Sequence, residues 1–190
     1  MTTFDSTKSS LSDLLREIRS GKIQLPDFQR GWVWDDDHIR DLLVSIARSF
    51  PIGAVMLLEA GGEVRFQTRP IEGLEGKIPL GQQPEKLILD GQQRLTTLTQ
   101  TLVLEEPVNT RTAKGKRIQR HYYFDIRKAV ESPHNLDEAV IAVDDNRQLR
   151  SNFGRDVELD LSTRELECQQ LYFPCSQIMS SDDWEATLHQ

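Results

Sequence analysis

Apolar residues recur at helical spacing in three stretches of this chain. The spacing predicts one helix over 11–20, a second over 36–49 and a third around Leu95. Ser, Asp, Gly or Pro residues stand at most of the expected helix ends, as helix starts and stops require. The stripes expected to face the core are Leu11, Leu14, Leu15 and Ile18, then Ile39, Leu42, Leu43 and Ile46, and finally Leu95, Leu98 and Leu102.

Short apolar runs between turn-forming residues predict the strands. The core strands are expected over 23–25, 52–58 and 87–89. A shorter strand is expected over 64–68, inside a glycine- and proline-rich excursion between two core strands. Further strands are expected over 121–126, 139–143 and 157–161, followed by a helix after Ser162-Thr163 and a last helix from Ser181 or Asp182.

Composition narrows the class of protein. Of the 190 residues, 37% are hydrophobic and 28% are charged, which is typical of a soluble globular domain. No apolar run approaches the roughly 20 residues that a membrane helix needs, and the N-terminus lacks a signal-peptide pattern. The two cysteines, Cys168 and Cys175, match no zinc spacing. We therefore expect a cytoplasmic protein with no membrane partner.

Residues 87–95 read LILDGQQRL and combine a strand, a tight turn and the start of a helix. A helix N-terminus presents unpaired N–H groups and suits an anion such as phosphate. Gly91 permits close approach of the backbone, and Arg94 offers a charged fork that fits phosphate. Asp90 repels phosphate unless a metal or proton intervenes, which points to chemistry. The alternative is an ordinary Asp-Gly turn, in which Asp90 caps the helix and Arg94 pairs with a surface acid.

Two other stretches are candidates for contact with DNA. Residues 26–34 carry three aromatic side chains, of which Phe28 and Trp32 are candidates to contact DNA, whereas core packing is the favoured interpretation of Trp32 and Trp34. Residues 107–120 carry the one basic patch, which either tracks DNA phosphates or is a solvated hairpin tip. Its basic residues are Arg111, Lys114, Lys116, Arg117 and Arg120. Because the net charge is −7, any contact with nucleic acid must be local.

The Gln29-Arg30 pair, the Pro51-Ile52-Gly53 segment that closes the second helix, and the turn over 90–94 together resemble a known family. The family is the ParB-like N-terminal domain of GmrS/GmrD-type modification-dependent restriction proteins and their phage-defence relatives. The resemblance runs from Leu11 to the end of the chain. It implies a ParB/sulfiredoxin-like α/β (α+β) fold, with a small mixed sheet flanked by helices and further helices at the C-terminal end. It also implies a nucleotide-binding domain over 1–160 and the start of a helical region over 161–190.

The resemblance implies binding and hydrolysis of a nucleoside triphosphate (NTP) that regulates DNA cleavage. Asp90 would hold Mg²⁺ or orient the attacking water. The phosphates would be bound by Gln29, Arg30, Gly53, Gly91 and Arg94. Gln92 and Gln93 would position phosphate or water, which makes Asp90, Gln92, Gln93 and Arg94 the expected catalytic group.

Full-length relatives often carry a C-terminal His-Asn-His nuclease domain, and this sequence contains no such motif and no P-loop. We therefore expect the chain to end before a nuclease domain, or to act with a partner subunit, as a monomer or homo-oligomer. A second hypothesis is a non-catalytic sensor that reads modified DNA and is regulated by nucleotide. A free-standing partition or transcription factor is the weakest alternative, because the chain is acidic and shows no helix-turn-helix signal.

Overall fold

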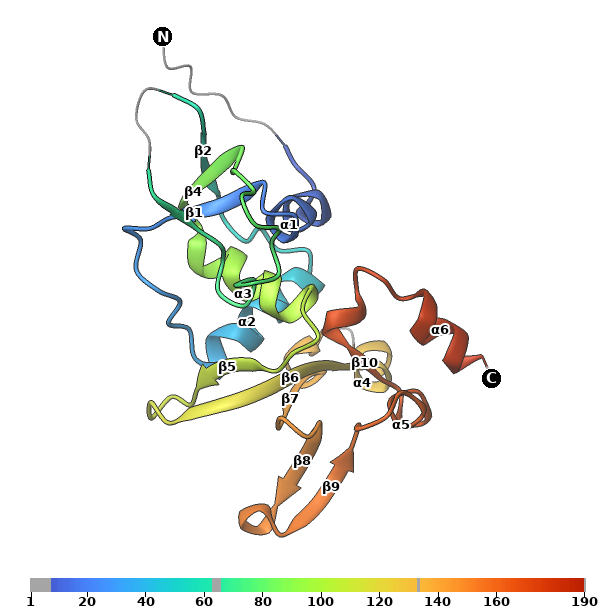
Figure 1. The fold of residues 1–190 in the computed structure, drawn as a ribbon. Helices are drawn as coiled ribbons and strands as arrows, with labels where there is room; N and C mark the ends of the chain where they lie inside the picture. Colours follow the sequence, from blue (N-terminus) through green and yellow to red (C-terminus); the bar gives the residue numbers. More distant parts are fainter. Residues whose placement is uncertain (1–7, 63–65, 133, 190) are drawn as a thin grey trace.

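A four-stranded mixed sheet forms the N-terminal half of the molecule, in a computed structural model that describes residues 8–62, 66–132 and 134–189 (Figure 1). Its strand order is β2-β4-β1-β3, with β1 and β4 parallel and both outer strands antiparallel to their neighbours. The parallel pair sets Ile23 opposite Lys86. The strands are β1 (Ile23–Pro26), β2 (Met56–Glu59), β3 (Thr68–Arg69) and β4 (Lys86–Asp90).

Three amphipathic helices bury their apolar faces in one core that they share with this sheet, as their apolar spacing predicts. They are α1 (Leu11–Arg19), α2 (Asp36–Ala47) and α3 (Gln92–Leu102). Side chains cap the first two, because Ser10 Oγ accepts from the N–H of Asp13 and Asp35 accepts from the N–H of His38. Residues from all three helices and from the sheet join one core cluster, which includes Leu15, Ile39, Leu43, Ile88, Leu95 and Leu98.

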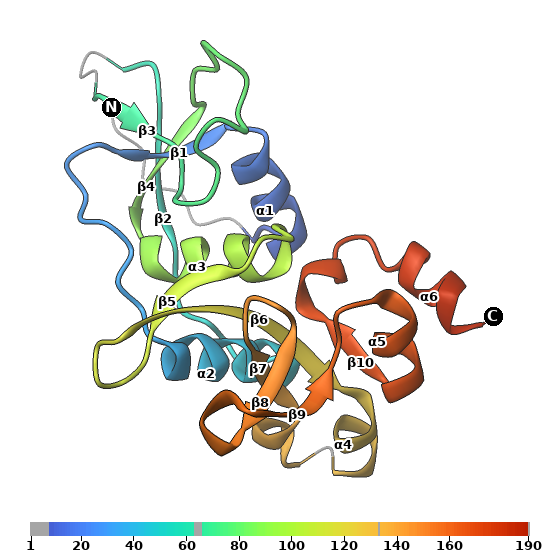
Figure 2. The same cartoon turned by 60° about the horizontal axis from the view of Figure 1, so that its bottom comes forward.

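A second antiparallel sheet lies beyond α2 and α3 (Figures 1 and 2). Its long central strand β6 (Arg117–Asp125) pairs with β5, β7 and β10. The partners are β5 (Val108–Arg111), β7 (Val140–Val143) and β10 (Tyr172–Pro174). A separate hairpin, β8 (Gln148–Ser151) and β9 (Asp156–Asp160), projects below it.

The remaining elements are short. The helices are α4 (Ile126–Glu131), α5 (Arg164–Gln170) and α6 (Asp182–Leu188), and the 3-10 turns are η1 (Leu136–Glu138), η2 (Asn152–Gly154) and η3 (Cys175–Gln177). The chain after residue 160 is built onto the second sheet, because β10 pairs with β6 and Cys175 belongs to the main core. The mixed sheet, flanking helices and C-terminal helices confirm the predicted α+β architecture.

Several elements differ from the sequence prediction. The strand expected over 52–58 begins only at Met56, because residues 52–54 form a turn that a guanidinium holds. The strand expected over 64–68 falls partly outside the described residues, and β3 starts at Thr68. Strands β5, β8 and β10 and helix α4 were not expected. Within the described residues, no helix has the length and apolar character needed to cross a membrane.

Candidate functional site

The tight turn after β4 leads into α3, and no side chain caps the first backbone N–H groups of this helix. Gly91 is the N-cap residue, adopts a left-handed φ of 89°, and leaves the first turn without a side-chain hydrogen bond. The alternative in which Asp90 caps this helix is therefore wrong. A Cβ at Gly91 would lie 3.0 Å from Val55 Cγ2, so glycine suits both the conformation and the packing. The N-terminus of α3 thus has the open N–H groups that an anion site requires.

Arg94 ties this helix start to the turn before β2. Its Nη1 donates to the carbonyl of Ile52, and its Nη2 donates to the carbonyl of Ala54 at 2.8 Å. Gly53, between those two carbonyls, has a φ of 90°. A guanidinium has five N–H donors, so donors remain beyond the two that hold the turn. The Arg94 side chain as a whole is 22% exposed.

Asp90 is an exposed member of the site. Its side chain is 73% exposed, and its Oδ2 lies 3.7 Å from Arg94 Nη2. This distance is long for a charge-assisted hydrogen bond, so the carboxylate is accessible to another partner. The described residues contain no cluster of three His, Cys, Asp or Glu side chains that could hold a metal. Within the part of the chain that the structure describes, Asp90 is therefore not part of a three-residue metal site of this kind.

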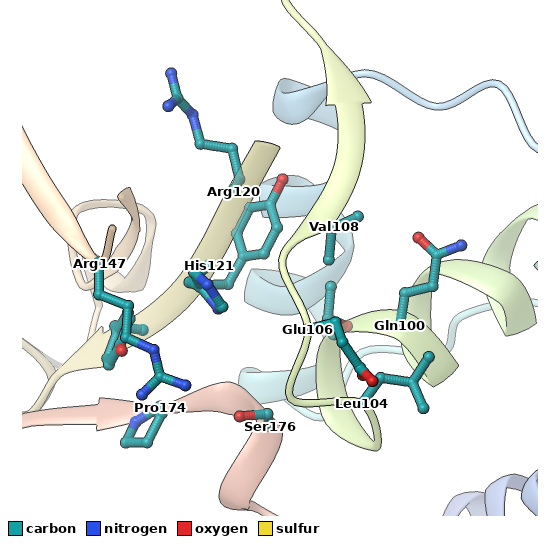
Figure 3. A pocket seen from close by; sticks show the side chains of 12 residues that line it. Gln100, Leu104, Glu106, Val108, Arg120, His121, Arg147, Pro174 and Ser176 are labelled. Atoms are coloured by element: carbon teal, nitrogen blue, oxygen red, sulfur yellow. The ribbon is translucent and has the colours of Figure 1, made fainter. Parts of the chain in front are cut away.

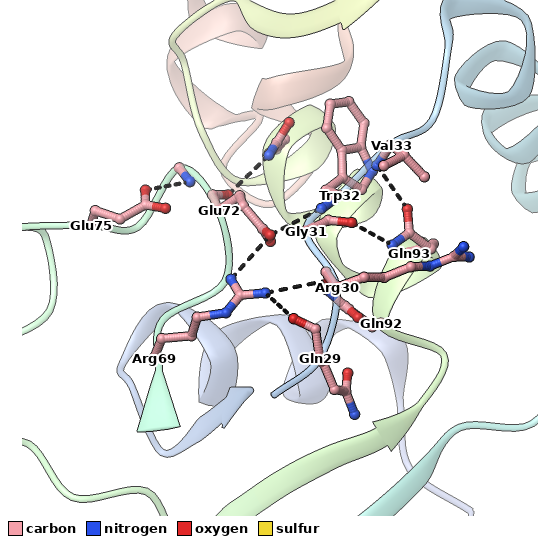
Figure 4. Close-up of polar contacts among 12 residues, drawn as sticks. Gln29, Arg30, Gly31, Trp32, Val33, Arg69, Glu72, Glu75, Gln92 and Gln93 are labelled. Atoms are coloured by element: carbon pink, nitrogen blue, oxygen red, sulfur yellow. Dashed lines mark hydrogen bonds and ion pairs between the residues drawn. The ribbon is translucent and has the colours of Figure 1, made fainter. Parts of the chain in front are cut away.

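The Gln29-Arg30 pair lies against this turn, although 60 residues separate them along the chain. Gln29 Nε2 donates to the carbonyls of Ile88 at 2.6 Å and Leu89 at 3.2 Å, at the end of β4. The exposed Arg30 side chain points away from that of Gln29 (Figure 4). The structure therefore brings together the two arginine-bearing motifs that the sequence singled out.

Residues 29–34, here called the strap, are fastened to α3 by both glutamines of the turn (Figure 4). Gln92 is 8% exposed, and its Nε2 donates to the Arg30 carbonyl at 2.6 Å. Gln93 Nε2 donates to the Gly31 carbonyl at 3.2 Å, and its Oε1 accepts from the N–H of Val33 at 3.0 Å. Each amide therefore positions the strap in this structure, and the expected contact of either one with phosphate or water stays a prediction.

Two residues that the sequence analysis did not single out support the strap from its other side. Glu72 Oε1 accepts from the N–H of Trp32 at 3.0 Å and from Arg69 Nη1 at 3.0 Å. Arg69 Nη2 also donates to the carbonyls of Gln29 and Arg30. Arg69 and Glu72 stand singly in the glycine- and proline-rich segment before β4, and no motif around them indicates a function. Their role depends on contacts with the strap, which is about 40 residues away along the chain.

The candidate DNA-contact residues fall into two separate places. An open groove of about 750 Å³ lies over the β5–β6 hairpin and is lined by Trp32, Trp34, Arg111, Lys116, Arg117 and Arg120, with Asp144 and Asp145 also in its lining. Lys114 lies in the exposed turn of the same hairpin. Phe28 is 69% exposed and instead stacks edge-on against Phe66, with ring centroids 5.6 Å apart.

The two tryptophans serve packing and the groove together. Both pack against the main core cluster, as the core-packing alternative holds, and both also line the groove. Trp32 Nε1 donates to Thr97 Oγ1 at 2.9 Å, which fixes its ring against α3. Trp34 stands beside His38, with ring centroids 5.9 Å apart.

A second cavity lies between β6 and η3 (Figure 3). It measures about 10 Å³, which is the volume for roughly one water molecule. Arg120, His121 and Arg147 are among its lining residues. Burial, with Arg147 nearby, lowers the pKa of His121 to about 4, so this histidine is neutral at pH 7. The cavity is too small for a nucleotide.

The fold and the site define a class of protein. It is a mixed α/β domain in which an uncapped helix N-terminus carries Arg94 and lies beside the Gln29-Arg30 pair. Residues 11–182 match the family model described as the GmrSD restriction endonuclease, N-terminal domain, and the chain belongs to that family. It is also 29% identical over 177 residues to the uncharacterized protein MJ0686 of Methanocaldococcus jannaschii. That match covers 91% of this chain and 29% of the relative, so the chain spans less than a third of the relative's length.

Proposed function

We propose that this domain binds and hydrolyses a nucleoside triphosphate at the turn between β4 and α3, and that the reaction regulates DNA cleavage in a restriction system. Membership of the GmrSD family supports a place in such a system. The observation that carries the proposal is that the segment of Gln29 and Arg30 lies against an uncapped helix start whose first turn carries Arg94. Cleavage itself would belong to a C-terminal nuclease domain or a partner subunit.

The residues divide the work of binding between backbone and side chains. The first N–H groups of α3, which Gly91 leaves without a side-chain cap, would donate to the phosphate oxygens, together with the remaining donors of Arg94 and the exposed Arg30. The Gly53 turn would add backbone N–H groups. Gln29, Gln92 and Gln93 would hold β4, α3 and the strap in register, so that the charged donors converge on one ligand.

Asp90 would provide the catalytic step. An exposed carboxylate beside a triphosphate raises the energy of the ground state unless a cation lies between them. Mg²⁺ in nucleotide sites is held by one or two carboxylates together with substrate phosphates and water, so a single exposed Asp90 fits a Mg²⁺ that arrives with the nucleotide. The ion would neutralise charge on the phosphates during transfer. Asp90 would orient the ion or the attacking water.

Phosphate release tests this proposal. The wild type, Asp90→Asn and a control variant, Asp182→Asn in α6, would be assayed with Mg²⁺ and each common NTP. We expect Asp90→Asn to lose turnover about a hundredfold or more, because the charge is lost while the size is kept. Its nucleotide affinity without Mg²⁺ should be equal or higher, and Asp182→Asn should match the wild type. Unchanged turnover in Asp90→Asn would retire the catalytic role.

The basic groove favours a second candidate function, a sensor that reads modified DNA. Aromatic Trp32 and Trp34 and the basic hairpin line one open surface, which is the combination used to bind nucleic acid. The two functions are separable. Phosphate release without DNA supports the enzyme, whereas salt-dependent DNA binding without release supports the sensor.

A further inference from the structure

The strap is held from two sides at one residue, Val33. Its N–H donates to Gln93 Oε1 at 3.0 Å, which fastens it to the first turn of α3. Its carbonyl accepts from Arg111 Nη2, at the end of β5. One peptide segment therefore connects the proposed nucleotide turn with the basic groove.

The hairpin holds the next residue of the strap as well. Thr110 Oγ1 donates to the carbonyl of Trp34 at 2.9 Å, and Thr110 is 6% exposed. Figures 1 and 2 show the strap running along the side of the molecule, from the end of β1 past the start of α3 to β5 and α2.

Arg111 has a stronger partner available than the Val33 carbonyl. It is exposed and lines the groove, and a phosphate offers a guanidinium an opposite charge and two parallel hydrogen bonds, neither of which a single neutral carbonyl provides. A phosphate backbone in the groove would therefore compete with the carbonyl of Val33 for Arg111. Loss of the Arg111 contact would free the Val33 peptide to shift, and this would weaken the hydrogen bond from the N–H of Val33 to Gln93 Oε1.

We propose that the strap couples the groove to the nucleotide turn, with Thr110 and Arg111 acting as positioning residues for that turn. The proposal rests on the function proposed above and on a phosphate backbone as the occupant of the groove. Coupling between two binding sites is reciprocal, so DNA in the groove and NTP at the turn must change each other's affinity by the same factor. Thr110 and Arg111 touch neither the nucleotide nor Asp90.

The test is the affinity for Mg²⁺–NTP measured with and without a short DNA duplex. Thr110→Val removes one hydroxyl and leaves every groove charge in place, and Thr110→Ser is the matched control that keeps the hydroxyl. In the wild type, DNA should change NTP affinity by at least about fivefold. In Thr110→Val, the factor by which DNA changes NTP affinity should fall towards one. DNA alone and NTP alone should each bind this variant within about threefold of the wild type. Thr110→Ser should show the same factor as the wild type.

Three results would overturn the coupling: no salt-dependent binding of the duplex, equal NTP affinity with and without DNA in the wild type, or an unchanged factor in Thr110→Val. If the wild type binds DNA but no NTP, the proposed function fails and the coupling is judged by amide exchange. The N–H of Val33 should then exchange faster with DNA bound in the wild type. Exchange that is the same with and without DNA would end the proposal.

Discussion

The guanidinium of Arg94 lies directly against the backbone of Gly53. Its two terminal nitrogens donate to the carbonyls on either side of that glycine, and a Cβ added at Gly53 would collide with Nη1. Arg94 thus joins the start of α3 to the turn around Gly53, so that a change at Gly53 also displaces the Arg94 guanidinium. This contact leads to the first prediction.

Gly53→Ala should lower both stability and NTP affinity. Gly53 has a φ of 90°, which costs roughly 1–2 kcal/mol for an L-residue, and the new methyl group must also displace Arg94. Gly61→Ala is the matched control, because Gly61 has a φ of 103° but no atom within 4 Å of an added Cβ. Urea unfolding and NTP titration should show the affinity loss only in Gly53→Ala. Equal nucleotide affinity in the two variants would contradict the account.

The basic hairpin should contribute to DNA binding and not to NTP binding. The variant would replace Arg111, Lys114, Lys116, Arg117 and Arg120 with Ser. Duplex affinity, measured by fluorescence anisotropy over a range of salt, should fall and lose most of its salt dependence, because each phosphate contact releases counterions. NTP affinity without DNA should stay within about threefold of the wild type, because Arg111 contacts the strap and not the nucleotide. Loss of NTP binding would instead place the hairpin in the nucleotide site.

Two histidines should affect the pH dependence of stability in opposite directions. Burial lowers the pKa of His121 to about 4, so its contribution is complete above about pH 6.5 and is lost as the pH falls towards 4. The hydrogen bond to Asp35 raises the pKa of His38, so its contribution is complete below about pH 6.5 and is lost as the pH rises through the raised value.

Urea unfolding at pH 7.5 and pH 4.5 measures these contributions. For each variant, the quantity compared is the free energy of unfolding of the wild type minus that of the variant. As the pH is lowered from 7.5 to 4.5, this difference should fall for His121→Gln and rise for His38→Gln. Carboxylates whose pKa does not depend on the replaced histidine cancel in each difference; the pKa of Asp35 is itself lowered by the hydrogen bond to His38, so Asp35 contributes to the His38 difference. If both differences change in the same direction with pH, the account of the surroundings of His121 or of His38 is wrong.

The sequence predicts those parts of the fold that carry a strong periodic signal. Helices α1, α2 and α3 each place a stripe of leucine or isoleucine in the core and begin at the expected caps or turn. Helix α4 was missed because it buries no residue within its six and so has no stripe. Strand β10 has three residues, too few for a period-two pattern, and is defined by its pairing with β6.

The site was predictable as a set of motifs but not as a set of contacts. The LILDGQQRL pattern identifies the strand, the turn and the helix start, and the structure sets Gln29-Arg30 against that turn. The strap could not be predicted, because the amides of Gln92 and Gln93 give the same signal whether they bind ligand or backbone. The chain between Ile52 and Val55 has apolar strand character, yet Arg94, 40 residues away, holds it as a turn.

Calorimetric titration with Mg²⁺–NTP tests the central claim most directly. The wild type should bind, and Arg94→Ala should bind about tenfold to a hundredfold more weakly, because a hydrogen bond to a charged group contributes about 1.5–3 kcal/mol. Arg19→Ala, which removes an exposed arginine at the end of α1, is the control and should bind as the wild type does. Circular dichroism would establish that each variant is folded. A folded Arg94→Ala that binds NTP as tightly as the wild type, or a wild type that binds none, would contradict the account.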